Sequence, residues 1–150
     1  MKLASLLYVA CLFMVACTTS KTTVSNGVDL AKYEYASVIN NDTYHIPAEL
    51  MEYEILLYDA VGNSRLELIG DWRIYELTPQ QQAKLLLVKY GVSRTESGES
   101  IVTVNFIDYM TGRPVASCRG AFALSFDPER NLRGAIKEVA KQISDTFPQR

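Results

Sequence analysis

The sequence predicts a mixed α/β domain of the α+β kind, in which two main amphipathic helices pack on a mixed, largely antiparallel sheet of four to five strands. Two observations lead to this prediction. Residues 85–126 hold three strand-like segments separated by short polar turns. Residues 47–63 and 127–147 each place apolar side chains along one helical face, and such a face needs a sheet to cover.

The domain is predicted to begin with a strand followed by a helix. Residues 32–39 are rich in aromatic and β-branched side chains, which is typical of a strand. A helix is expected over 47–63, because Pro47 suits a first turn and Gly62 suits a C-cap. Its apolar face is expected to comprise Leu50, Tyr53, Leu57, Ala60 and Val61, widened by Met51, Ile55 and Tyr58.

The next segment is predicted to be one irregular strand and a short helix. Residues 65–77 alternate well enough for a single strand that is interrupted or bulged near Gly70. Thr78 is a good cap residue and Pro79 a good first-turn residue, so one or two helical turns are expected over 78–81.

The three segments that follow are predicted to form an antiparallel meander. Strands are expected over 85–94, 100–109 and 115–126, and Gly112 lies in the second turn at a position that favours positive φ. The last of these strands has an alternating set of residues that is expected to form its buried face: Ala116, Cys118, Gly120, Phe122, Leu124 and Phe126.

The terminal helix over 127–147 has the clearest signals in the chain. Asp127 is a good N-cap and Pro128 suits the first helical position. One apolar stripe is expected to be core, formed by Leu132, Ala135, Ile136, Val139, Ala140, Ile143 and Phe147.

The first seventeen residues have the features of a targeting signal. Lys2 precedes an uncharged run from Leu3 to Val15, and the run ends in Met14-Val15-Ala16-Cys17. This resembles the signal peptide and lipobox of bacterial lipoproteins, with Cys11 a poorer candidate for the box cysteine. The resemblance implies that residues 1–16 are removed and that Cys17 becomes the lipidated first residue, with fatty-acyl chains such as palmitate as the membrane anchor.

Residues 17–28 are therefore predicted to be the lipidated cysteine and a flexible polar tether, and residues 29–150 a single globular periplasmic domain. Thr18 stands where the sorting rule of lipoproteins would look for an aspartate that retains them in the inner membrane. The resemblance thus implies the outer membrane of the cell envelope, with the domain facing the periplasm.

The sequence offers no recognisable catalytic set, so no enzyme activity, cofactor or metal is predicted. His45 is the single histidine, and neither a G-x-S-x-G elbow nor a phosphate-binding glycine loop is present. Lys and Arg alternate with Asp and Glu at a net charge of −2, which gives no indication of nucleic-acid binding. Cys118 is expected to be a buried, inert thiol.

Two aromatic residues are candidate partner contacts. Trp72 and Tyr75, together with Tyr33 and Tyr35, would form a patch for a protein or sugar if they were exposed, although aromatic residues in strands are more often core.

The layout also carries a resemblance. The stretch DLAKYEYASVI from Asp29, the hairpin DYMTGRPVAS from Asp108 and the closing helix resemble small envelope lipoproteins. Their domain is similar to the amino-terminal domain of the Tol-Pal propeller protein, to curli secretion lipoproteins and to lipoprotein activators of penicillin-binding proteins. The resemblance implies a non-enzymatic adaptor or assembly factor with an envelope protein partner. A binding module for a small molecule, lipid or glycan remains the alternative.

Overall fold

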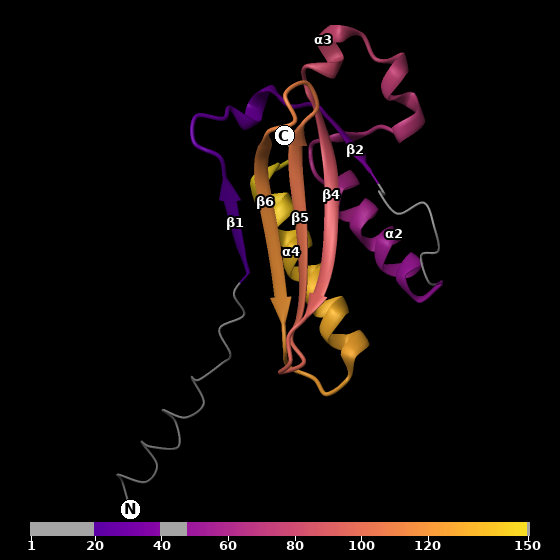
Figure 1. The fold of residues 1–150 in the computed structure, drawn as a ribbon, viewed down its shortest axis with the longest axis vertical. Coiled ribbons are helices and arrows are strands. Elements are labelled where there is room, and N and C mark those ends of the chain that lie inside the picture. Colours follow the sequence, from indigo (N-terminus) through magenta and orange to yellow (C-terminus); the bar gives the residue numbers. More distant parts are fainter. Residues whose placement is uncertain (1–19, 40–47, 150) are drawn as a thin grey trace, which may run out of the picture.

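The computed structural model describes residues 20–39 and 48–149, with the side chains of 48–50 left aside. The described chain forms one six-stranded sheet in the order β1-β6-β5-β4-β2-β3 (Figure 1). Its strands are β1 (Lys21–Val24), β2 (Tyr35–Val38), β3 (Glu67–Leu68), β4 (Leu85–Arg94), β5 (Ser100–Asp108) and β6 (Pro114–Phe122).

The helical elements lie between and after these strands. Two are long α-helices, α2 (Ala48–Gly62) and α4 (Pro128–Thr146), and three are short, namely η1 (Leu30–Lys32), η2 (Asp71–Glu76) and α3 (Pro79–Gln82). The predictions for α2, α3 and α4 are confirmed. The Asp127 carboxylate caps α4 at the Glu129 amide, and Thr78 and Gln81 form the capping box of α3.

The sheet is mixed, as expected, but has six strands rather than four to five. β4, β5 and β6 form the predicted antiparallel meander, and Gly112 in its second turn has a φ of 67°. β2 pairs in parallel with β4 on one side and with β3 on the other, while β1 pairs antiparallel with β6. The prediction omitted the outer strand β1, which is four residues long, and it expected a longer strand than the two residues of β3.

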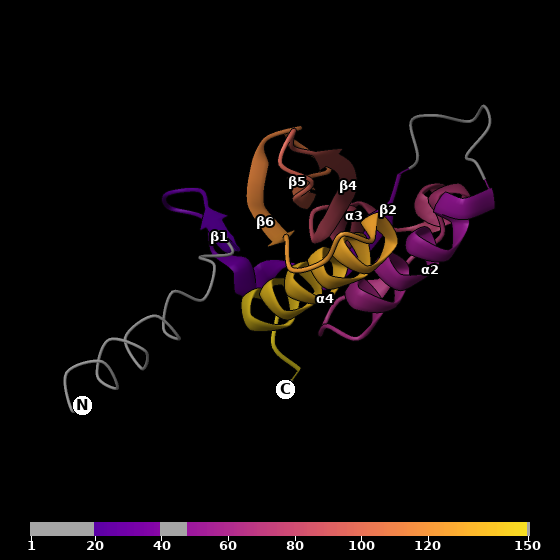
Figure 2. The same cartoon turned by 90° about the horizontal axis from the view of Figure 1, so that it is seen from below.

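Both long helices cover the same face of the sheet (Figure 2). Val102, Val104 and Phe106 of β5 point into the core beneath α4, and the residues between them are only half-buried. Gly120 of β6 allows the closest approach. A Cβ added there would lie 2.1 Å from the Ala135 carbonyl oxygen of α4, so only glycine permits this spacing.

The polar segment before the domain is partly ordered, which corrects the predicted tether over 17–28. Residues Lys21–Val24 form β1, and the Ser20 hydroxyl accepts a hydrogen bond of 3.2 Å from the Ala121 amide. The Thr22 hydroxyl donates to the Gln142 side chain of α4 at 2.8 Å. A segment without hydrophobic periodicity can still form an edge strand, because backbone pairing requires no apolar side chain.

Three expected strands are shorter than predicted. Residues 65–77 form only β3 before the chain turns into η2, where the Asp71 carboxylate accepts from the Trp72 amide and the Arg73 amide donates to the Gly70 carbonyl. β6 ends at Phe122, so Leu124 and Phe126 lie beyond the sheet instead of on its buried face. The strand expected over 32–39 begins at Tyr35, after η1.

Among the described residues, no helix is both long and apolar enough to span a membrane. The predicted signal peptide, Cys17 and His45 lie outside the described residues.

Candidate functional site

Helix α2 carries apolar residues on two faces, and only one of them is buried. Tyr53 and Leu57 pack into the core, as predicted. Met51, Ile55 and Tyr58 were expected to widen that buried face, but they are 55%, 60% and 38% exposed. Their spacing of four and three residues places them together on the outer side of the helix. This outer stripe is the first part of an exposed apolar surface.

The second part is η2, where Trp72 and Tyr75 are 70% and 86% exposed. Ile74 is the one buried residue of η2 and holds it against the domain. In a 3₁₀-helix, residues three apart lie above one another, so Trp72 and Tyr75 share the outward face. The two predicted contact residues are therefore both available to a partner. Tyr33 is buried and Tyr35 half-buried, so the expected patch does not extend to them.

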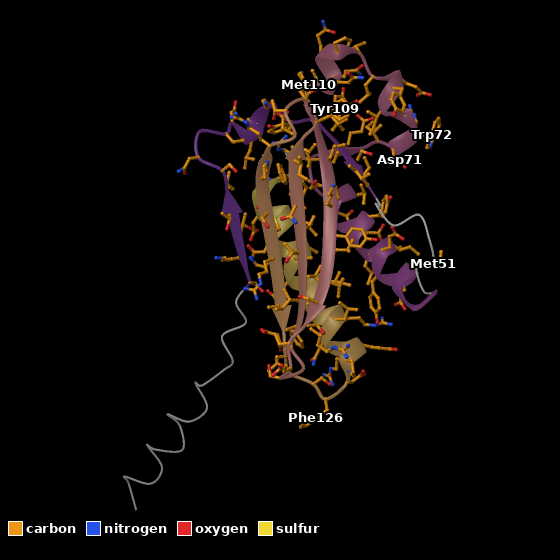
Figure 3. The ribbon with its side chains drawn as sticks, in the orientation of Figure 1. Met51, Asp71, Trp72, Tyr109, Met110 and Phe126 are labelled. Carbon is orange, nitrogen blue, oxygen red and sulfur yellow. The ribbon has the colours of Figure 1, made fainter. Side chains whose placement is uncertain are left out.

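These two parts lie on the same side of the molecule, where Figure 3 labels Met51, Asp71 and Trp72. Burial raises the pKa of Tyr58, and the negative charges of Glu54 and Asp71 raise it further. We call Met51, Ile55, Tyr58, Trp72 and Tyr75 the α2–η2 surface.

The α2–η2 surface has a charged border, in which Arg73 of η2 pairs with Glu76 at 3.1 Å. Helix α2 contains glutamate and aspartate but neither lysine nor arginine. Glu52 is held by Arg133 of α4 at 2.8 Å, and Glu54 accepts a hydrogen bond of 3.0 Å from the Tyr90 hydroxyl. The arrangement is an apolar and aromatic centre with charged groups around it, which is the usual anatomy of a protein interface.

A second candidate is a polar cleft at the end of the sheet where β5 turns into β6. The cleft has a volume of about 540 Å³ and lies between residues 25–29, the end of η1 and the turn at 108–115. Lys32 and Arg113 contribute positive charge to its lining. Its deepest charged group is the Asp108 carboxylate, since this residue is only 5% exposed.

Four donors surround the Asp108 carboxylate. The Tyr33 hydroxyl donates to Oδ2 at 2.8 Å and the Lys32 ammonium group at 3.1 Å, while the Thr111 amide and hydroxyl donate to Oδ1 at 2.9 and 3.1 Å. Burial alone would raise the pKa of Asp108, but these hydrogen bonds outweigh it and lower the pKa to about 2. The charged carboxylate thus links η1 to the β5–β6 turn through its hydrogen bonds.

The Asp108 carboxylate is thus bonded to Lys32, Tyr33 and Thr111, while Arg113 lines the same cleft. Asp108 ends β5 at the start of the hairpin, and its bonds to Thr111 hold the turn that follows. The contacts with Lys32 and Tyr33 were missed, because no local pattern indicates a pairing across 75 or 76 residues.

Cys118 is fully buried, as predicted. Burial raises the pKa of its thiol, which keeps it protonated and unreactive at neutral pH. Within the described part of the chain, no group of three or more histidine, cysteine, aspartate or glutamate side chains is placed to hold a metal ion.

Comparison with known proteins shows similarity in fold alone. Neither a family model nor a curated protein matches the chain. The chain is similar to PelC of Paraburkholderia phytofirmans, solved as a dodecamer, with 14% identity and a TM-score of 0.53 over 88% of this chain and 99% of that one. It is also similar to a PDZ domain protein of Parabacteroides distasonis, with 13% identity and a TM-score of 0.51 over 83% of this chain and 35% of that one.

Proposed function

We propose that this protein is a lipid-anchored periplasmic lipoprotein that acts without catalysis, as an adaptor or assembly factor in the cell envelope. Acyl chains on Cys17 attach it to the membrane, in our proposal the outer membrane, and the α2–η2 surface makes the protein contacts. The observation that carries the proposal is the exposure of Ile55, Trp72 and Tyr75 on one side of the domain.

The composition of this surface supports a protein as its ligand. Trp and Tyr are enriched where protein interfaces gain most of their binding energy, because they bury a large area and lose little conformational entropy. A pocket for a small molecule would be concave, whereas these side chains stand on the outer sides of α2 and η2. A border with charges of both signs suits a partner with complementary polar residues at the rim of its interface.

Self-association is one form that such contacts could take here, since the PelC neighbour was solved as a dodecamer. In a head-to-tail assembly, the α2–η2 side of one copy would meet a different side of the next, and such contacts close into rings or extend into filaments. We therefore propose that the partners of this surface include further copies of the chain.

Two measurements test the proposal. Intact-mass analysis of the protein purified from membranes should show an acylated chain that starts at Cys17, and Cys17→Ser should lack the added mass. A mature chain that starts elsewhere and carries no lipid would refute the anchor.

The contact surface is tested by crosslinking in intact envelopes, followed by identification of the captured proteins and of self-crosslinked species. The double variant Ile55→Ser/Trp72→Ser should lose captured partners or self-crosslinks at unchanged abundance, because both side chains are exposed and contribute little to folding. Met110→Ser is the matched control, an exposed apolar residue in the β5–β6 turn that lies outside the α2–η2 surface. Equal crosslinking by the double variant and wild type would refute the assignment of the surface.

The polar cleft supports binding of a small molecule as a second candidate function. Its two cations, Lys32 and Arg113, would favour an anionic group such as a carboxylate or phosphate. Arg113→Ala leaves the hydrogen bonds of the Asp108 carboxylate in place, so it tests ligand binding without breaking the link between η1 and the β5–β6 turn. Citrate and inorganic phosphate are suitable probes, and a thermal shift that is present in wild type and absent in Arg113→Ala would support this candidate.

A further inference from the structure

The loop between β6 and α4 presents two apolar side chains to solvent. Leu124 is 65% exposed and Phe126 is 109% exposed, which makes Phe126 the most exposed large apolar residue of the described chain. Both were expected inside the sheet, and both lie past its end (Figure 3). Single exposed apolar side chains are common on soluble proteins, so the exposure of this pair becomes informative only through the place of the loop in the molecule.

The loop that carries these side chains is held in place by a buried asparagine. Asn131 is 2% exposed, its Oδ1 accepts from the Ser125 amide at 2.9 Å, and its Nδ2 donates to the Ser125 carbonyl at 2.7 Å. Nδ2 also donates to the Gly98 carbonyl in the β4–β5 turn at 3.1 Å. Asn131 thus bonds both the amide and the carbonyl group of Ser125, which holds the loop in one conformation. In that conformation the neighbouring side chains of Leu124 and Phe126 face the solvent.

This loop lies at the end of the sheet where the chain enters the domain. β1 begins at Lys21, opposite Arg119, and the Ser20 hydroxyl is bonded to the Ala121 amide, two residues before the loop starts. Figure 3 shows Phe126 at one extremity of the molecule and Met110, in the β5–β6 turn, near the other. Cys17 is three residues before Ser20. Three residues span at most about 10 Å, so an anchor on Cys17 holds this end of the sheet close to the membrane surface.

We propose that Leu124 and Phe126 form a membrane-contacting tip that inserts into the interface of the bilayer to which Cys17 is anchored. The partner is a phospholipid surface, and the tip fixes the orientation of the domain on it. This inference rests on the lipid anchor of the proposed function. It adds that the folded domain itself touches the membrane, with α4 rising from it and the β5–β6 turn pointing away.

Charge at this end favours apolar insertion over electrostatic adsorption. Exposed residues near the tip carry both signs, with Arg94 and Arg130 beside Glu96, Asp127 and Glu129. A mixed set of charges gives no strong preference for anionic lipids. Binding through the tip should therefore persist at high salt, where a Debye length of about 3 Å at 1 M screens surface charges.

Fluorescence quenching in vesicles tests the inference on the lipidated full-length protein. The variant Trp72→Phe/Phe126→Trp has its single tryptophan at the tip, and Trp72→Phe/Met110→Trp has it at the opposite end as a matched control. Each is reconstituted into phosphatidylethanolamine and phosphatidylglycerol vesicles containing phosphatidylcholine brominated near the start of its acyl chains. We expect about twofold lower emission at residue 126, because a side chain at the interface lies ~5–10 Å into the headgroup and acyl boundary. Emission at residue 110 should be unchanged.

The possible outcomes separate this inference from the proposed anchor. If the purified protein lacks the mass of the acyl chains, the lipid anchor is refuted, and the membrane-contacting tip loses the observation on which it rests. An acylated protein whose residue 126 is not quenched refutes the tip alone, and a blue-shifted but unquenched emission there would instead assign the tip to a protein contact. Quenching at 126 that persists in 1 M salt and is absent at 110 supports the inference. Because Phe126 is fully exposed, its replacement by tryptophan should leave the melting temperature unchanged, which checks that the fold is intact.

Discussion

The substitution Asp108→Asn should destabilise the protein strongly at neutral pH. The carboxylate is 5% exposed and accepts hydrogen bonds from Tyr33, Lys32 and Thr111. Asparagine keeps one acceptor oxygen for Thr111 but turns an amide group of two donors toward the Tyr33 hydroxyl and the Lys32 ammonium group. The η1 segment would then lose its bond to the β5–β6 turn, and a positive charge at the edge of the cleft would lose its counter-ion.

The magnitude follows from the lowered pKa of Asp108. A fall from 3.8 to about 2 corresponds to roughly 2.5 kcal/mol of stability at neutral pH. Because the folded-state pKa is below the unfolded-state value, this stability is fully present above about pH 5 and is lost as the pH falls through 4 toward 2. Between pH 6 and pH 3 the wild type should lose roughly 1 kcal/mol from this group, whereas Asp108→Asn has no carboxylate there to titrate.

Urea unfolding of both proteins between pH 6 and pH 3 measures this effect. The stability difference between wild type and Asp108→Asn should be roughly 2.5 kcal/mol at pH 6 and about 1 kcal/mol smaller at pH 3. Glu34→Gln is the control, because it breaks the exposed ion pair with Lys84, which is worth about 0.5 kcal/mol. A difference for Asp108→Asn that stays constant with pH would refute the role of the buried charge.

Three further substitutions and one control test the packing and the hydrogen bonds of the domain. Gly120→Ala should cost about 3 kcal/mol or more in a urea titration, since its Cβ would lie 2.5 Å from the Val139 nitrogen, whereas Gly91→Ala, with open space around it, should cost less than about 0.5 kcal/mol. Ile143→Ala should lower stability by ~2–5 kcal/mol because the side chain is fully buried, and an unchanged melting temperature would contradict the assignment of α4 to the core. Asn131→Ala should cost ~1–3 kcal/mol and raise the hydrogen exchange of the Ser125 amide.

Much of the architecture could be predicted because local and tertiary preferences agree there. Asp127 and Pro128 mark the start of α4, and its apolar stripe meets a sheet whose strands alternate between buried and half-buried residues. The meander was predictable for the same reason, since its polar turns separate segments of clear strand composition. In such elements every signal favours one structure.

The edge strand β1 and the parallel pairing of β3 were not predictable from their own residues. β1 has no buried position, and its place at the edge of the sheet depends on backbone pairing with β6 and on the bond from Thr22 to α4. β3 is two residues long and pairs in parallel with β2. Parallel pairing joins strands that are far apart in sequence, so no hairpin signal is available to indicate it.

The candidate sites were missed, or found only in part, because apolar periodicity does not report exposure. Trp72 and Tyr75 were named as contacts, but they were placed in a strand, where an aromatic side chain is more often buried. Met51, Ile55 and Tyr58 were assigned to the core because they extend a helical stripe, yet they lie outward. A helix with apolar side chains on two sides presents more apolar area than one sheet can cover.

The residues that were predicted to be buried and are exposed lie at the surfaces for which we propose a function. An apolar pattern indicates that residues avoid water, but it does not show whether the core, a partner or a lipid surface covers them. Leu124 and Phe126 continue the alternation of β6 without a break, but the sheet ends at Phe122 and Asn131 fixes the chain that follows in a loop. These two residues therefore lie on the surface, where an apolar pattern does not distinguish water from a partner, and the proposed anchor on Cys17 would place a bilayer within their reach.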